Sequence, residues 1–388
     1  MKNLIVLIVL FISVCNFGQK KTNDIVLGEE LVIASKYLKD TKSLQIYLPE
    51  NYEEKKLNKK FPVLYILDSQ WFFSSGVGVQ QSLRDNDILP EMIIVGIKTD
   101  SSGRYTILGE EKLNFESFIK KELIPFIDSK FTTSKVRILF GWEFAAYFSS
   151  EILLKNDTSF LGAIACNGGY VDTLTLKNLE LEKTKYLFLA NSKKDIYNIS
   201  STESFKKSLT GIKPSNLIWH YQLFNEEFHE SLPYISLYKG LRFYFKNFAS
   251  LRFESIKEFE DMGGFEYLES YYKDRGKRFG LPSEIDDGVK NSLIWLAWKR
   301  DNFTYFKIFM EKFKDVLQTK RYQSGYWQNR LGQFYLKYKD FNNAIKHFEI
   351  GVSKYKDSKQ ITKIYTGLSK AYRAIGNNEK AQFFEKKN

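Results

Sequence analysis

The order of short apolar segments and amphipathic segments constrains the fold of this chain more than any other feature. Between residues 28 and 248, seven short segments rich in β-branched or aromatic residues predict strands: 44–48, 62–67, 92–97, 136–140, 161–166, 185–190 and 217–223. Segments with helical periodicity lie between them, at 115–129, 143–154, 202–209 and 233–247. Strands that alternate with helices predict an α/β fold with a mostly parallel sheet covered on both faces.

The pattern changes at about residue 250, where strand signals end and amphipathic helices continue to the C-terminus. One pattern of positions in this part occurs twice, 37 residues apart: Leu331, Gly332, Tyr335, Lys339 and Ala344, then Leu368, Ser369, Tyr372, Gly376 and Ala381. A fainter copy lies at Leu293, Ala297, Asp301 and Phe306. The spacing is similar to the period of about 34 residues in tetratricopeptide repeats, so we expect a tetratricopeptide-like helical domain over residues 251–388. A bundle of unrelated helical hairpins is the alternative.

Charge is distributed unevenly along the chain. Its formal net charge is +12, and residues 301–388 alone hold 18 Lys and Arg against 8 Asp and Glu. This basic tail indicates an acidic partner, which would be a polypeptide, an anionic polysaccharide or a membrane surface. A solvated basic face without a partner is the alternative. Nucleic acid is not expected, because no nucleic-acid motif is visible.

The N-terminus has the pattern of an export signal. Lys2 precedes an apolar run from Leu4 to Val14, and a polar exit follows at residues 16–19. The run is too short to span a bilayer, so residues 1–19 are expected to be a signal peptide, with a buried N-terminal helix as the alternative. The protein is therefore expected to be periplasmic or secreted. Cys15 is a candidate for lipid anchoring, although Val14 is bulky for such a site.

The sharpest local signal is the segment VRILFGWEFAAYFS at residues 136–149. An apolar strand runs directly into Gly141, Trp142, Glu143, Phe144 and Ala145 and then into a helix. This has the shape of a nucleophile elbow, in which small residues on both sides let the strand and helix approach closely. Gly141 and Ala145 supply the small positions, but the central residue is Glu143 where such elbows carry Ser.

Six segments in order resemble the esterase family of α/β-hydrolases that includes esterase D and the enterochelin esterases. They are LQIYLPENY at 44–52, PVLYILDS at 62–69, IVGI at 94–97 followed by Arg104, ELIPFID at 122–128, the elbow, and His229 before the helix at 232–248. The resemblance covers about 220 residues and implies an α/β-hydrolase domain over residues 28–250. Two departures from its pattern are Ala145-Ala146 in place of two glycines and Ser69 in place of the glycine of "LDG".

Carried over residue by residue, the catalytic triad of the family would fall on Glu143, Asp195 and His229. The alternatives are an exposed turn aspartate for Asp195 and a simple polar contact for His229. A carboxylate is a poor nucleophile toward an ester. The leading hypothesis is therefore a degenerate triad in which Glu143 pairs with His229. The other two hypotheses are an altered mechanism with Glu143 as general base, and a nucleophile located elsewhere in the chain.

The resemblance also places a ligand pocket at the carboxyl ends of the strands. Its oxyanion donors would be the N–H of Phe144 and one N–H of the Ser69–Gln70 turn. Trp71, Phe72, Phe73 and Trp142 would hold a sugar or acyl group, unless they only pack in the core. His220 and His347 are expected to be structural, and Cys166 to be a buried, inert strand residue.

These observations predict an exported protein that binds an ester, acyl or glycan-like ligand without serine-esterase catalysis. A protein partner is expected at residues 290–388. The alternative function is an active carboxylic-ester hydrolase that uses Glu143 and His229. Two cysteines exclude a disulfide framework and three histidines argue against a His-rich metal site, so no metal or organic cofactor is expected.

Overall fold

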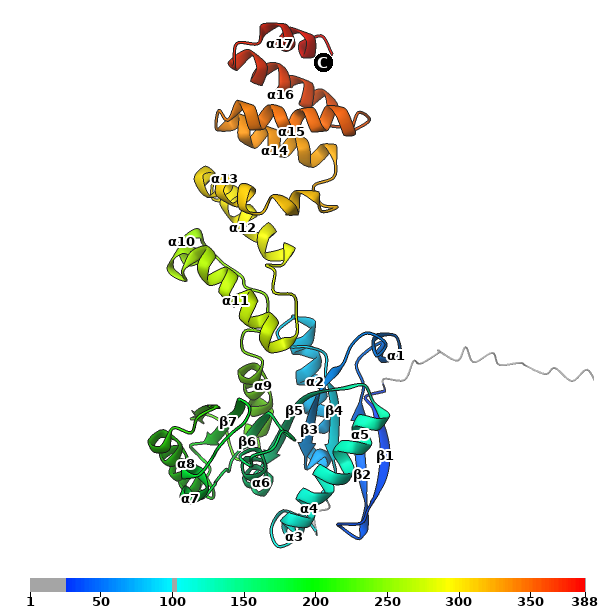
Figure 1. Cartoon of the computed structure of the whole chain (residues 1–388), viewed down its shortest axis with the longest axis vertical. Coiled ribbons are helices and arrows are strands. Elements are labelled where there is room, and N and C mark those ends of the chain that lie inside the picture. Colours follow the sequence, from blue (N-terminus) through cyan, green and yellow to red (C-terminus); the bar gives the residue numbers. More distant parts are fainter. Residues whose placement is uncertain (1–25, 100–102, 388) are drawn as a thin grey trace, which may run out of the picture. The chain divides into compact units, whose positions relative to one another are not determined.

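The computed structural model describes residues 26–99 and 103–387. The expected signal peptide (1–19) and Cys15 lie outside the described residues. The chain divides into two compact units, of which one ends at Lys246 and the other begins at Asn247 (Figure 1). No helix among the described residues is long and apolar enough to span a membrane.

The first unit is built on an eight-stranded sheet with the order β1-β2-β4-β3-β5-β6-β7-β8. The strands β3 to β8 are parallel to one another, and the pairs β1–β2 and β2–β4 are antiparallel. The mostly parallel α/β sheet predicted from the sequence is therefore confirmed. The strands are β1 (Glu29–Ser35), β2 (Asp40–Tyr47), β3 (Phe61–Leu67), β4 (Ile93–Ile97), β5 (Thr133–Trp142), β6 (Gly162–Cys166), β7 (Lys185–Ser192) and β8 (Leu217–Phe224).

Helices lie between the strands of this unit. They are α1 (Tyr52–Lys55), α2 (Ser69–Asp85), α3 (Arg104–Leu108), α4 (Lys112–Phe118), the π-helical turn η1 (Ile119–Leu123), α5 (Ile124–Lys130), α6 (Phe144–Leu153), α7 (Thr173–Lys177), α8 (Ile199–Ile212) and α9 (Leu232–Tyr244). The sequence pattern missed β1, α2 and the short helices α1, α3 and α7, and it merged α4, η1 and α5 into one helix.

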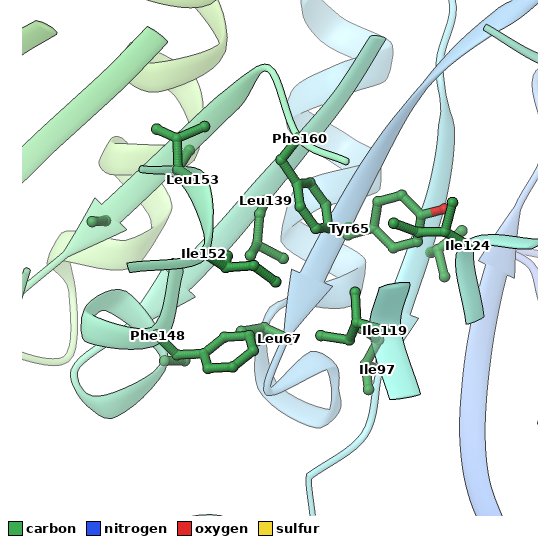
Figure 2. Packing of buried hydrophobic residues seen from close by; sticks show 14 of the residues in the cluster. Tyr65, Leu67, Ile97, Ile119, Ile124, Leu139, Phe148, Ile152, Leu153 and Phe160 are labelled. Carbon is green, nitrogen blue, oxygen red and sulfur yellow. The ribbon is translucent and has the colours of Figure 1, made fainter. Parts of the chain in front are cut away.

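Successive side chains of the central strands point to opposite faces of the sheet, and helices pack on both faces. Tyr65 and Leu67 of β3 pack in a core with Ile119, Ile124 and residues of α6 (Figure 2). Tyr65 meets Phe160 edge to face at 5.6 Å between ring centroids. Ile66 points to the opposite face, where it lies against Gly76 of α2, and Ile164 of β6 lies against Gly240 of α9 in the same way. These glycines let both helices lie close to the strands.

The second unit is entirely helical among the described residues. Its helices are α10 (Ile256–Asp261), α11 (Gly264–Phe279), α12 (Asp287–Lys299), α13 (Phe303–Lys312), the 3-10 turn η2 (Lys314–Gln318), α14 (Gly325–Lys337), α15 (Phe341–Lys354), α16 (Ile361–Ala374) and α17 (Asn378–Glu385). Its core is a separate cluster of apolar residues that runs from Ile256 to Ala381. The predicted C-terminal helical region is thus present.

The repeated sequence positions occupy equivalent places in the hairpins α12–α13, α14–α15 and α16–α17. Between the two helices of each hairpin, one residue adopts a left-handed conformation: Asp301, Lys339 and Gly376, with φ of 54°, 60° and 82°. The next residue, Asn302, Asp340 or Asn377, caps the second helix with its side chain. Gly332 has no room for a Cβ, because one would meet the Phe348 ring at 2.5 Å. The repeat therefore encodes both the turn and the close helix packing.

Candidate functional site

The junction between β5 and α6 is a sharp turn with Glu143 at its centre. Glu143 has φ 52° and ψ −116°, a conformation that non-glycine residues rarely adopt. Gly141 makes the turn possible, since a Cβ there would come within 2.1 Å of the Ala145 carbonyl oxygen. The Glu143 N–H donates to the Cys166 carbonyl at 2.9 Å, which ties the turn to β6. The strained turn therefore holds the Glu143 side chain at the carboxyl end of β5.

Both carboxylate oxygens of Glu143 have cationic or imidazole partners. Oε1 lies 2.7 Å from Nε2 of His229, and Oε2 accepts a hydrogen bond of 3.1 Å from Nη1 of Arg104. The His229 backbone is held in turn, because its carbonyl accepts from Asn167 Nδ2 at 2.7 Å and from Trp142 Nε1 at 3.3 Å. The elbow carboxylate is thus fixed between two rigidly placed groups.

Asp195 lies on the other side of the His229 ring. Its Oδ1 is 3.4 Å from Nδ1 of His229 and accepts the Tyr197 N–H at 2.9 Å. Asp195 follows β7 and is buried, so the exposed-turn alternative for this residue is wrong. The structure therefore brings Glu143, His229 and Asp195 into one line, although His229 Nδ1 and Asp195 Oδ2 form no hydrogen bond within the described parts of the chain.

A buried ion pair next to the elbow was not singled out by the sequence pattern. Arg104 donates from Nε and Nη2 to the two carboxylate oxygens of Asp68, both at 2.9 Å. Its Nη2 also donates to the Trp142 carbonyl at 3.0 Å, and Thr99 donates its hydroxyl to Asp68. Burial alone would lower the pKa of Arg104, but the hydrogen bonds and charge of Asp68, together with Glu143, raise it. This network joins the ends of β3 and β5 to α3.

The residues predicted to contact a ligand include three at the start of α2. Ser69, Gln70 and Trp71 form the first turn of α2 rather than a free turn. Gln70 donates its amide to the Thr99 carbonyl at 2.7 Å, and the Ser69 hydroxyl is buried without a partner among the described residues.

Aromatic rings surround the elbow. Trp71 meets Trp142 edge to face at 6.0 Å between centroids, and Trp142 lies 4.9 Å from the His229 ring. Trp71 and Phe144 expose 44% and 45% of their surface. Phe72 and Phe73 are buried, so their expected role as rim residues is wrong and the core-packing alternative holds for them.

The other side chains that could act in catalysis lie away from the elbow, are buried, or donate their hydroxyls to the backbone. Ser149 and Ser150 donate their buried hydroxyls back to the carbonyls of Ala145 and Ala146. These two hydroxyls are therefore engaged within α6. Burial raises the pKa of Cys166, which keeps its thiol neutral, and His220 stacks on Phe188 within the sheet. No cluster of His, Cys, Asp and Glu among the described residues could hold a metal ion.

The fold and the strand–turn–helix junction define an α/β-hydrolase. The profile of the family described as "Putative esterase" matches residues 35–235, slightly more than half of the chain. The chain therefore belongs to this esterase family.

Solved structures agree with the fold. An IroE-like serine hydrolase from Shewanella oneidensis is 22% identical with a TM-score of 0.55, over 73% of this chain and 98% of that one. An uncharacterised protein from Capnocytophaga ochracea is 16% identical with a TM-score of 0.61, over 84% and 94% of the two chains. BES protein from Bacillus cereus is 20% identical with a TM-score of 0.51, over 60% and 98%. No protein in the curated comparison matches the chain.

Proposed function

We propose that this esterase-family chain binds a small ester, acyl or glycan-like ligand without hydrolysing it by the serine mechanism. One observation carries the proposal: the elbow side chain is the carboxylate of Glu143, and its two oxygens already pair with His229 and Arg104. A serine esterase needs a hydroxyl at this point with the imidazole Nε2 free to take its proton. Here the same Nε2 is occupied by the residue that replaces the nucleophile.

Backbone donors and exposed rings support the binding half of the proposal. The helices α2 and α6 begin directly after the neighbouring parallel strands β3 and β5, so their N-termini lie at the same edge of the sheet. The first N–H groups of a helix have no acceptor within the helix and can donate to a ligand oxygen. The exposed rings of Trp71 and Phe144 would cover the apolar part of such a ligand.

The second candidate is an ester hydrolase in which Glu143 activates water as a general base. The alignment of Glu143, His229 and Asp195 favours it, because these residues form a chain in which a proton could be held. The two functions differ in whether the bound ester is hydrolysed.

A single NMR experiment separates them. Methyl butyrate is mixed with the purified protein, saturation transfer to the ester reports binding, and the methanol signal reports hydrolysis. We expect saturation transfer without methanol above buffer background, and loss of transfer in Trp71→Ala but not in Phe383→Ala, which removes an exposed ring of α17. Methanol release that His229→Ala abolishes would replace the proposal with the hydrolase alternative. Absence of saturation transfer would refute ligand binding.

Export and a protein contact through the helical unit belong to the same proposal. The apolar segment at residues 4–14 supports export, and the basic repeats support a tetratricopeptide-like contact surface over residues 290–388.

A further inference from the structure

A groove in the helical unit has the features of a binding site that is separate from the elbow. Its volume is about 520 Å³, and its walls come from α13, η2, α14 and α15. This volume falls within the range of about 300–1,000 Å³ that is typical of small-molecule pockets. The groove lies in the part of the chain where most of the net positive charge is found, and the proposed ligand site at the elbow does not include it.

Three buried polar side chains line the groove: Gln328, Tyr335 and His347. Gln328 donates its amide to the Tyr322 carbonyl at 3.1 Å, and its Oε1 lies 2.9 Å from Nδ1 of His347. Because an amide oxygen only accepts, Nδ1 carries the ring proton and Nε2 carries a lone pair. Burial and the nearby Lys346 lower the pKa of His347 to about 4, so the ring is neutral near pH 7.

Two polar atoms of these side chains have no hydrogen-bond partner among the described residues. They are the hydroxyl of Tyr335, whose ring stacks on His347 at 5.5 Å between centroids, and Nε2 of His347. Neither atom is among the fully buried polar atoms of the described residues, so water or a ligand can reach both of them and supply the partner. The hydroxyl of a ligand could donate to Nε2, and the phenol could donate to a ligand oxygen.

Four lysines stand around these buried groups: Lys307, Lys314, Lys346 and Lys354. Glu311 is the one acidic residue that lines the groove, and it lies 3.9 Å from Lys314. Lys346 and Lys354 form no ion pair with the described residues. The groove therefore combines a positively charged rim with neutral donors and acceptors beneath it.

We propose that this groove binds a hydroxylated organic anion, namely a sugar that carries a carboxylate or a phosphate group. The lysines would attract the anionic group, while Gln328, Tyr335 and His347 would pair with sugar hydroxyls. The inference goes beyond the proposed function and does not depend on it, because no residue of the elbow takes part.

Isothermal titration calorimetry on the whole protein tests the proposal with galacturonate, galactose 6-phosphate and neutral galactose. We expect one or both anionic sugars to bind with an affinity that falls as salt rises, and galactose to bind much more weakly. The carboxylate and phosphate arms identify which anion the groove prefers. The double change Lys346→Gln with Lys354→Gln should weaken binding by about tenfold at low salt.

Two further variants separate the groove from general charge effects. Tyr335→Phe keeps the ring stacked on His347 but removes the hydroxyl, and should weaken binding severalfold without loss of helical circular dichroism. Lys370→Gln removes an exposed lysine of α16 that does not line the groove, and should leave binding unchanged. The proposal is overturned if neither anionic sugar binds at millimolar concentrations. It is equally overturned if Lys370→Gln weakens binding as much as the groove variants do.

Discussion

At the scale of single residues, Glu143 occupies a position that combines an unusual backbone with an unusual side chain. The backbone is that of a nucleophile elbow, with φ 52° and ψ −116°. The side chain is a carboxylate held by Arg104 and His229 instead of a hydroxyl poised for attack. The turn thus has the backbone of a nucleophile elbow with a carboxylate at its centre, and strain of this kind usually marks functional sites.

Removal of one partner from the buried ion pair of Arg104 with Asp68 should strongly destabilise the first unit. Both side chains are buried, so Arg104→Leu would leave the Asp68 carboxylate without its cation and should lower the free energy of unfolding by about 3–5 kcal/mol. The change Asp68→Asn in the same chain should restore part of this loss, because the unpaired charge disappears. Urea unfolding followed by tryptophan fluorescence measures both effects.

The matched control is Arg373→Leu, which breaks an exposed pair with Glu385 in α17. It should change stability by less than about 1 kcal/mol. Equal losses for Arg104→Leu and Arg373→Leu would show that the buried network is not a special source of stability.

Part of the site could be predicted from the sequence, and the rest could not, for physical reasons. The elbow was visible because a strand, small residues and a helix are adjacent in the chain, and the family resemblance located His229 and Asp195. The contacts of Arg104 with Asp68 and Glu143 join residues 36 and 39 positions apart. No local sequence pattern predicts contacts between residues so far apart. The contacts of Arg104 with the two carboxylates were therefore found only in the structure.

At the scale of elements, the apolar central strands were predictable, and the irregular elements were not. The strand β1 has mostly exposed or half-buried residues at the sheet edge, so it lacks a continuous apolar run. Helix α2 contains Gly76 and Gly78, which are poor helix formers, and its stability comes from packing on the sheet. Tertiary contacts decide both elements, which explains why periodicity alone missed them.

The buried imidazole of His347 predicts acid sensitivity in the helical unit. Its pKa is lowered to about 4 in the fold from an ordinary value of 6.5, so the unfolded chain binds a proton first as pH falls. The stabilising contribution is complete above pH 6.5 and is lost as pH falls toward 4. The total loss from this group should be about 3 kcal/mol.

The substitution His347→Gln should reduce this loss, since glutamine does not titrate. Urea unfolding monitored by circular dichroism at pH 7 and pH 4.5 compares the variant with the wild type, and His220→Gln serves as the control in the other unit. A decrease in stability on acidification that is the same in all three proteins would contradict the assignment to His347.

At the scale of the whole molecule, the two units have separate hydrophobic cores and different charge. One core gathers the sheet and its helices, and the other joins α10 to α17. A sheet-containing part followed by a helical region was predictable from the sequence, because strand signals end at about residue 250. The family match covers residues 35–235, which lie within the first unit.

Separate cores predict that each unit folds without the other. Fragments of residues 26–246 and 247–387 should each unfold cooperatively in urea, and the amide NMR spectrum of each should largely match its part of the whole protein. Spectra with the narrow dispersion of an unfolded chain, for either fragment, would contradict this expectation.

Whether Glu143 alone separates this site from a serine esterase is tested by the rate of p-nitrophenyl acetate hydrolysis. The rate is measured for the wild type, Glu143→Ser and Glu143→Ser with His229→Ala. If Glu143 alone separates this site from a serine esterase, the wild type should not exceed buffer background. Glu143→Ser should then gain about hundredfold or more, and the added His229→Ala should remove that gain. A wild-type rate above background that Glu143→Ser lowers would contradict the non-catalytic role of Glu143, because the carboxylate would then be catalysing hydrolysis itself.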